Sequence, residues 1–486
     1  MIPRVSIITL GSRGNIQPFI AIALVLQAKY AIRFMSSEDH KDFITGFNIE
    51  FVNICPKVLY NKAQVKGFGY QLTYLDASRT NEFNQHVKYV KNEFEENRPN
   101  LILVGSLSEY FEYYAKYILL IPTIRVCLST LHLGNDVRYH YLVQAFLYNT
   151  FSYYDKAIGR LNSGVCQRIT KEEFILESEE IMNGRNSRHI VVCQPCAFFK
   201  ILVNVPLVGP CSINSNLEDI HNHCFGGHNA KVKIDEFIRE REDVTLHKDK
   251  PIYCTWGSAH KFSSNTLMRL IVTLTRSKQS GIILIPNLSN ELKNQVYALI
   301  HDESVRDHFG YHVLLLAQAP HDYLFPKVKC IVHHGGKSTA LAAIRAGVPS
   351  VIVSTAMTKN GSTSIERLHQ TYICHACGFG EVIGGSPESY EPEKLSGAIL
   401  RVIRNRKMLR RCEDASRELR RIDGCSTLVK YVDCMMTAKQ PNNAPESAKI
   451  GARLKQSKDD DSNTTEAESL PDYYRSEDSG HDSEGN

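Results

Sequence analysis

The chain has 486 residues, of which 43% are hydrophobic and 22% are charged, so it is too long for one ordinary core and too apolar to be disordered throughout. Two domains are therefore expected. The 14 cysteines lack the dense spacing of a small secreted scaffold, and Arg4 is followed at once by a strand-like run. No run reaches the roughly 18 apolar residues that a spanning helix needs. We expect a cytoplasmic protein, soluble or peripheral on membranes.

Charge divides the chain into a basic body and an acidic tail. Residues 458–486 contain ten acids and two cations, a net charge of −8, and since the whole chain carries +5, the remaining residues carry +13. A basic body suits phosphate-bearing ligands or an anionic membrane surface, although solvated helices are the commoner cause of such an excess. Residues 439–486 are rich in Ser, Asp, Glu, Asn and Pro, which predicts a disordered acidic tail.

Strand-like and helical patterns alternate from the start of the chain. Residues 5–10 predict a strand, a loop follows at 11–14, and the apolar period of 18–26 predicts a helix. A helix is also expected over 81–97, and further strands at 32–36, 101–104 and 123–128. Such alternation is typical of a parallel sheet wrapped by helices.

The alternation stops over residues 214–250, which we interpret as a linker with a short helix at 234–241, and then resumes. The second half contains an Arg-rich helical region at 392–436, helices expected at 266–275 and 338–346, and strands expected at 251–255, 282–285, 312–316, 330–332 and 350–353. The sequence therefore predicts an α/β protein with two doubly wound parallel sheets. The predicted divisions are an N-terminal domain 1–213, the linker, a C-terminal domain 251–438 and the tail 439–486.

In doubly wound sheets, ligands bind beyond the carboxyl ends of the strands. The loops expected to face one cleft are therefore those at Gly11, Gly257, Pro286, Ala319, His333 and Ser354.

The segment at residues 332–349, VHHGGKSTALAAIRAGVP, is the most informative. A strand runs into two histidines and two glycines, and a helix begins near Ser338. Glycines allow a ligand to approach the backbone, and a helix N-terminus favours an anion, so the segment predicts a phosphate site. A P-loop is rejected because Ile331 occupies the position where that motif needs its first glycine. An ordinary strand-to-helix turn remains the alternative.

Several segments, in order, resemble the UDP-glycosyltransferase superfamily and its sterol 3-beta-glucosyltransferase-like members. Residues 332–349 are similar to the family's phosphate-binding motif, and residues 319–326, APHDYLFP, to its nucleoside-side loop. Residues 251–258, PIYCTWGS, resemble its strand ending in Gly-Ser. The opening loop GSRGNIQP at 11–18 resembles that of the sterol-type and antibiotic-type members, and residues 419–432 resemble its closing helix. The resemblance covers most of residues 5–436.

The resemblance implies the GT-B fold, with two facing Rossmann-like domains, and inverting transfer of a hexose, glucose by analogy, from a UDP-sugar to a hydroxyl of a lipophilic acceptor such as a sterol. No cofactor or metal is implied beyond the UDP-sugar donor. By position, the donor-binding residues are Ser258, Ala319, His321, His334, Gly335, Gly336, Ser338 and Thr339, and the acceptor-side loop contains Gly11, Ser12, Arg13 and Gly14. Of the paired histidines, His334 is favoured for the diphosphate, and His333 is interpreted as a structural hydrogen-bonding residue.

Two positions depart from the family pattern. The family places a base, Asp or His, directly after the second glycine of the opening loop, where this chain has Asn15, whose amide cannot accept a proton at neutral pH. The family's sugar-binding Asp-Gln pair has no clear counterpart at residues 354–362. His132 is a candidate substitute base, although a lone loop histidine is more often structural. The alternative hypothesis is a catalytically weak member that binds a nucleotide-sugar or lipid in a regulatory role.

Other patterns are weaker. The pairs Cys193/Cys196 and Cys374/Cys377 have Cys-x-x-Cys spacing but fall in different predicted domains, so chance and core packing are favoured over zinc. The Arg-rich run at 401–421 has acids among its cations, which favours an amphipathic surface helix over nucleic-acid binding.

Overall fold

The structure is a computed structural model of the chain. It describes residues 2–55, 81–105, 108, 115, 119–128, 190–192, 208–213, 222–225, 228–243, 250–257, 260–354, 374–375 and 377–437. Both sheets belong to one compact unit, Met1–Met436. The predicted disordered tail lies outside the described residues, and the predicted domain boundaries remain predictions.

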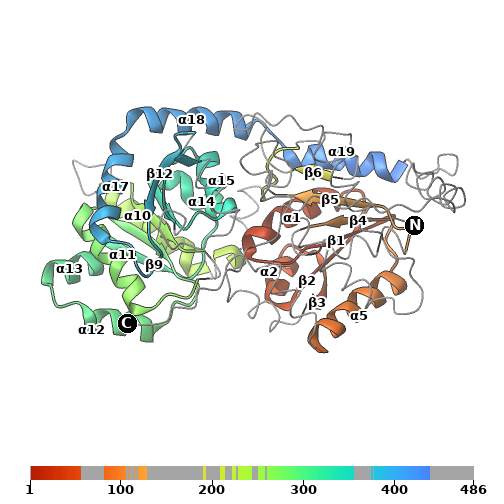
Figure 1. Cartoon of the computed structure of the whole chain (residues 1–486), viewed down its shortest axis with the longest axis horizontal. Helices are drawn as coiled ribbons and strands as arrows, with labels where there is room; N and C mark the ends of the chain where they lie inside the picture. Colours follow the sequence, from red (N-terminus) through yellow and green to blue (C-terminus); the bar gives the residue numbers. More distant parts are fainter. Residues whose placement is uncertain are drawn as a thin grey trace, which may run out of the picture. The chain divides into compact units, whose positions relative to one another are not determined.

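The first sheet is parallel throughout, with the strand order β3-β2-β1-β4-β5-β6. Its strands are β1 (Arg4–Ile8), β2 (Ala31–Ser37), β3 (Glu50–Cys55), β4 (Leu101–Val104), β5 (Thr123–Cys127) and β6 (Ile190–Val192). Its helical elements include α1 (Arg13–Leu26), η1 (Glu38–His40), α2 (Lys41–Thr45) and α5 (Asn81–Glu96), and α1 and α5 flank the strands (Figure 1). From β1 the chain adds β2 and β3 toward one edge of the sheet. It then returns to place β4 on the other side of β1 and continues to β6.

The second sheet has the same topology, with the order β12-β11-β10-β7-β8-β9. Its strands are β7 (Ile252–Thr255), β8 (Gly281–Leu284), β9 (Val313–Leu316), β10 (Cys330–His333), β11 (Ser350–Ser354) and β12 (Gly380–Gly384). The helical elements from residue 222 onward are η6 (Asn222–Phe225), α10 (His228–Asp243), α11 (Ser264–Ser277), α12 (Asn290–Leu299), α13 (Glu303–His312), α14 (His321–Leu324), η7 (Phe325–Lys327), α15 (Lys337–Ala346), α17 (Pro392–Arg404), α18 (Arg406–Arg420) and α19 (Gly424–Thr437). The predicted α/β class with two doubly wound parallel sheets is therefore confirmed.

Both faces of the second sheet are buried, and alternate residues of each strand enter different apolar clusters. In β7, Ile252 and Cys254 pack in the cluster that α11 and α17 cover, whereas Tyr253 packs in the cluster on the other side. In β10, Val332 packs in the cluster under α11 and α17, and Ile331 packs in the cluster on the other side. Successive side chains of a strand point to opposite faces, so burial on both sides explains why these strands are almost continuously apolar.

The last helix packs back onto the N-terminal half. Asp433 of α19 accepts hydrogen bonds from Lys29 and from the Tyr30 hydroxyl, each at 2.6 Å. At the start of α19, Gly424 lies against residues 208–213, because a Cβ atom built on Gly424 would be 2.4 Å from the carbonyl oxygen of Gly209. Only a glycine allows the two backbones to come this close.

Several element boundaries differ from the sequence-based expectation. Helix α1 begins at Arg13 instead of residue 18, so half of the predicted loop, residues 13–14, lies in its first turn. Strands β3, β6 and β12 and helices α12 and α13 were not predicted. The predicted linker contains α10, which is longer than the short helix expected there, and the predicted region at 392–436 divides into three helices. Among the described helices, none combines the length and apolar character needed to cross a bilayer.

The contact at Gly424 generates a stability prediction. We expect Gly424→Ala to lower the free energy of unfolding by about 1–3 kcal/mol, because the new methyl group collides with backbone oxygens that cannot move away easily. The measurement is urea denaturation followed by circular dichroism.

The matched control for this test is Gly397→Ala. A Cβ atom at Gly397, within α17, meets only the flexible end of Arg401 at 3.3 Å. It should be neutral or stabilising because alanine favours a helix. Equal stability of the two variants would contradict the close packing of α19.

Candidate functional site

The predicted phosphate segment lies at the switch point of the second sheet. Strands β7 and β10 are neighbours, with His333 paired to Thr255 at their carboxyl ends. The chain leaves these strands toward opposite edges of the sheet, and such a point opens the crevice in which doubly wound folds bind ligands. Gly257 follows one strand and His334 follows the other.

The imidazole of His334 occupies a space that two glycines create. A Cβ atom on Gly257 would lie 2.6 Å from Cε1 of His334, and one on Gly336 would lie 2.8 Å from its Nε2. Gly257 also has a φ of +84°, a left-handed conformation that residues with side chains rarely adopt. The two glycines therefore fix the position of this histidine at the crevice.

Helix α15 begins beside that ring with its N-terminus in a form suited to an anion. Its N-cap is Gly336, which has no side chain to cap the helix, and its first turn contains no acidic residue. The positive end of the helix dipole is thus not offset by a carboxylate in the first turn of α15. Of the neighbouring predicted donor residues, Thr339 is buried in the first turn.

His333 performs a different task from its neighbour. Its side chain is fully buried, and its Nδ1 accepts a hydrogen bond from the backbone N–H of Gly335 at 3.2 Å. Burial lowers the pKa of His333 to about 3, so the ring is neutral with its proton on Nε2. This geometry agrees with the predicted structural role, and it also engages the N–H of Gly335.

The predicted nucleoside-side loop follows β9. Ala319 is buried, and the His321 ring stacks on Phe325 with a centroid separation of 4.4 Å and an interplanar angle of 19°. The Tyr253 hydroxyl lies 3.5 Å from Nε2 of His321. Burial, followed by the positive charge of Arg13, lowers the pKa of His321 to about 3, so this ring is also neutral. The result is a cluster of packed rings after β9, formed by Tyr253, His321 and Phe325.

The opening loop is held by a histidine that the sequence analysis did not identify. His40 is buried after β2, and its Nε2 donates to the carbonyl of Gly11 at 2.8 Å. Gly11 has a φ of +119°, and a Cβ atom there would lie 2.2 Å from the side-chain nitrogen of Asn15. Asn15 therefore folds over Gly11. This contact follows from the pairing of β1 with β2, because parallel neighbours bring the residues that follow each strand together at one edge of the sheet.

A hydrogen bond joins the two predicted loops. Ser338 at the start of α15 donates its hydroxyl proton to the carbonyl of Gly14 at 2.7 Å. In a regular helix that carbonyl would accept from the residue four positions later, but this residue is Pro18, which has no N–H. Ser338, predicted to hold the diphosphate, thus also satisfies a carbonyl that α1 leaves open.

The remaining residues of the opening loop lie beside this bond. Ser12 is the N-cap of α1 and makes no side-chain cap, and the guanidinium of Arg13 lies 4.1 Å from the centroid of the Phe43 ring. No acidic residue occurs in the first turn of α1. Two helix N-termini without acidic residues therefore contact each other here, which favours binding of a negatively charged group.

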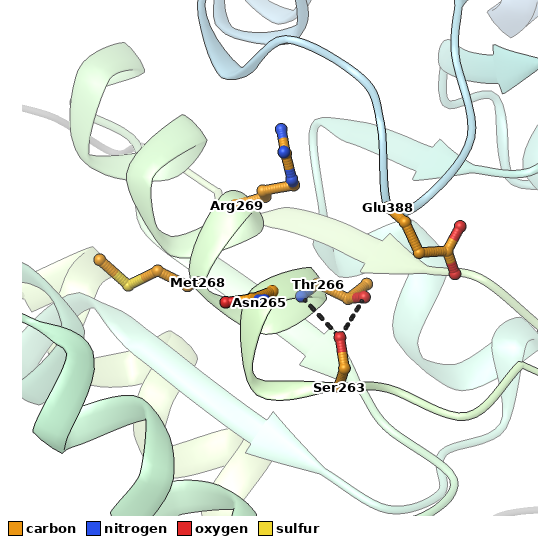
Figure 2. A pocket seen from close by; sticks show the side chains of 6 residues that line it. All are labelled: Ser263, Asn265, Thr266, Met268, Arg269 and Glu388. Carbon is orange, nitrogen blue, oxygen red and sulfur yellow. Dashed lines mark hydrogen bonds between the residues drawn. The ribbon is translucent and has the colours of Figure 1, made fainter.

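A cavity of about 470 Å³ lies near the N-terminus of α11 (Figure 2). The Ser263 hydroxyl caps α11 by accepting from the N–H of Thr266 at 3.1 Å, and Arg269 donates to the carbonyl of Tyr390. The lining residues are Ser263, Asn265, Thr266, Met268, Arg269 and Glu388, none of which is a predicted donor residue. Ser258 belongs to the same β7–α11 connection but lies outside the described residues.

Other predicted residues also fall outside the described part of the chain. They are His132, Cys193, Cys196 and residues 355–362. Cys374 is described, and it is buried in a small apolar cluster with Phe379 and Cys412. Within the described ranges, no group of three or more His, Cys, Asp or Glu side chains is placed to hold a metal ion.

Comparison with solved structures defines the class of fold. The chain matches the calicheamicin glycosyltransferase CalG4 with a TM-score of 0.61 and 14% identity, over 91% of this chain and 100% of that one. It matches a Streptomyces sp. SF2575 glycosyltransferase, SsfS6 complexed with thymidine diphosphate, with a TM-score of 0.54 and 15% identity, over 89% of this chain and 99% of that one. The fold is therefore GT-B, as predicted.

Comparison of sequences gives matches of higher identity than the structural comparison does, and these matches are to sterol 3-beta-glucosyltransferases. The chain is 22% identical over 360 residues to a sterol 3-beta-glucosyltransferase of Yarrowia lipolytica and 24% identical over 361 residues to one of Kluyveromyces lactis, in each case over 71% of this chain. These matches cover 24% and 28% of the relatives, so the chain spans about a quarter of their length. An Arabidopsis thaliana sterol 3-beta-glucosyltransferase is 37% identical over 106 residues, 22% of this chain and 15% of that protein. No family model matches. The resemblance inferred from the motifs is confirmed.

The glycine cradle of His334 generates a binding prediction. We expect His334→Ala to weaken UDP binding about tenfold to a hundredfold, the usual effect of losing a hydrogen bond to a charged group. Gly336→Ala should weaken it as well, because the new methyl group displaces the ring. Isothermal titration calorimetry with UDP measures both effects.

Gly310→Ala is the control for this test, since a Cβ atom at Gly310 in α13 meets nothing within 4 Å. Its UDP affinity should equal that of the wild type. If both site variants also bound UDP with unchanged affinity, the assignment of His334 to the diphosphate would be wrong.

The neutral, buried His333 generates a pH prediction. Because its folded pKa of about 3 lies below the ordinary value of about 6.5, the unfolded chain binds the proton more readily. Its contribution to stability is therefore present above about pH 6.5 and is lost as the pH falls toward 3. We expect the free energy of unfolding to fall by up to about 1.4 kcal/mol per pH unit from this group.

The variant His333→Asn keeps an acceptor for the N–H of Gly335 but does not titrate. Urea denaturation between pH 7.5 and 5 should show a shallower loss of stability for the variant than for the wild type. Identical slopes would mean that His333 is not held neutral by burial.

Proposed function

We propose that the chain transfers a hexose, with glucose expected, from a UDP-sugar to a hydroxyl group of a lipophilic acceptor such as a sterol. The observation that supports this most strongly is the His334 ring between two glycines at the N-terminus of α15, at the switch point of a GT-B sheet. The similarity to sterol 3-beta-glucosyltransferases supports the choice of acceptor class. A cytoplasmic location with peripheral contact to membranes is part of the same proposal.

The chemistry follows from where charge develops. The acceptor oxygen forms a bond to the anomeric carbon, and the bond from that carbon to the UDP oxygen breaks with inversion. Negative charge then grows on the diphosphate, where the positive end of α15 and His334 stabilise it. We expect no cofactor, because the positive end of α15 and His334 can stabilise the departing UDP.

The acceptor proton also needs a destination. Asn15 occupies the position of the family's base, but its amide can only donate or accept a hydrogen bond and cannot take the proton. His132 remains a candidate base outside the described residues. We propose that Asn15 orients the acceptor hydroxyl and that transfer is slower than a carboxylate at this position would allow.

Asn15→Asp tests this account of the base. The new carboxylate would lie in the first turn of α1, where the helix dipole and Arg13 keep it ionised at neutral pH. We expect kcat for steryl glucoside formation to rise by at least about tenfold, since general-base catalysis typically contributes 10²- to 10⁴-fold. The KM for the UDP-sugar should stay the same. Product is measured by mass spectrometry.

The control is Asn15→Ala, which removes the amide without supplying a base and should not increase kcat. A fall in kcat for Asn15→Asp would show instead that the amide has a role that a carboxylate cannot fill.

A further inference from the structure

A dense cluster of cations lies where α17 meets α18. Arg404, Arg406, Lys407, Arg410 and Arg411 are all exposed, and we refer to these five residues as the basic corner. No acidic residue occurs from position 394 to position 412. The corner is thus a surface of one sign of charge within a helical region whose later turns mix both signs.

One cation on each side of the basic corner is paired with an acid. Arg401 in α17 pairs with Glu381, and Arg417 in α18 pairs with Asp414. Within the part of the chain that the structure describes, the side chains of the corner's five residues form no ion pair or hydrogen bond. Their charges are therefore available to a partner.

The placement of these charges is unfavourable for the isolated fold. Arg406 and Lys407 occupy the first turn of α18, at the positive end of its dipole, where an acid would be stabilising. They also lie four residues before Arg410 and Arg411, and like charges at this spacing repel. The negative end of α17 offsets part of this cost. Asn405 caps α18 through its side chain, accepting from the N–H of Met408 at 3.1 Å, so the helix start itself is well formed.

We propose that the basic corner binds the anionic surface of a lipid bilayer. Its cations lie on the exposed side of two consecutive helices, and each cation near an anionic bilayer adds about a fivefold gain in affinity. No aromatic side chain occurs from residue 391 to residue 421, so the surface lacks the stacking groups that single-stranded nucleic-acid sites use. The preference for a bilayer over another anionic partner rests on the proposed function, because a lipophilic acceptor resides in membranes.

Co-sedimentation of the full chain with vesicles tests the proposal without donor or acceptor. We expect binding to phosphatidylcholine vesicles that contain about 30% phosphatidylserine and little binding to phosphatidylcholine alone. Binding should disappear in about 0.5 M NaCl, because salt screens exposed charges. Equal binding to both kinds of vesicle would overturn the proposal, and so would absence of binding.

The variant Arg404→Gln/Arg406→Gln/Lys407→Gln/Arg410→Gln identifies the surface. It should bind the anionic vesicles at least about 100-fold more weakly, at roughly fivefold per cation. Arg411 is left in place because its guanidinium packs against Gly378. The control Arg417→Gln/Arg420→Gln/Arg421→Gln/Lys430→Gln removes the same charge from the neighbouring turns and should stay within about fivefold of the wild type.

Two further readouts complete the test. The corner variant should melt at the same temperature as the wild type or higher, because repulsion between like charges is removed, and it should bind UDP with unchanged affinity. Full vesicle binding by the corner variant, or displacement of wild-type protein from vesicles by an equal concentration of RNA, would overturn the proposal. Since vesicle binding needs no transfer, a chain that docks but transfers no sugar would contradict only the proposed function.

Discussion

The carbonyl of Gly14 has no acceptor role inside its own helix, because Pro18 cannot donate to it, and Ser338 supplies the missing hydrogen bond at 2.7 Å. This bond joins the first turn of α1, which carries Asn15, to the first turn of α15, which carries the predicted diphosphate site. Buried or half-buried carbonyls are costly to leave without a partner, so the proline creates a requirement that a residue distant in sequence meets. The predicted acceptor-side loop and the predicted donor-side helix are thereby linked.

The site combines neutral buried groups and oriented backbone with two cations, Arg13 and Lys337, at the starts of α1 and α15. His333 and His40 are buried and His321 is half-buried, and desolvation lowers the pKa of each, so they act as fixed donors and acceptors instead of charges. The positive character comes from the N-termini of α1 and α15, which have no acidic residue in their first turns, and from Arg13 and Lys337 at their first positions. A site of this kind can stabilise the charge that develops on a diphosphate, and no ion pair within the site has to break first.

The sequence predicted those features that depend on local patterns. Alternating apolar runs and turns identified most strands, and the segment at 332–349 indicated a strand, a glycine turn and a helix, all of which the structure contains. The start of α1 was misplaced because Pro18 is typical of a first helical turn, whereas here it lies inside the helix and Ser338 meets the carbonyl that it leaves open. His40 and the Gly257–His334 contact depend on which strands are neighbours, and no local pattern encodes this. Strand β12, with the sequence GEVIG, has only two aliphatic residues between glycines and a glutamate, so no apolar run marked it.

The central claim is that a UDP-sugar binds at the N-terminus of α15 and loses its sugar to a lipophilic alcohol. The most direct measurement is UDP release from UDP-glucose by the purified chain, with and without a panel of sterols. The account predicts release that requires an acceptor and yields one steryl glucoside for each UDP. Absence of release with every acceptor, together with absence of UDP binding by calorimetry, would contradict it and would mean that the GT-B fold serves another ligand in this protein.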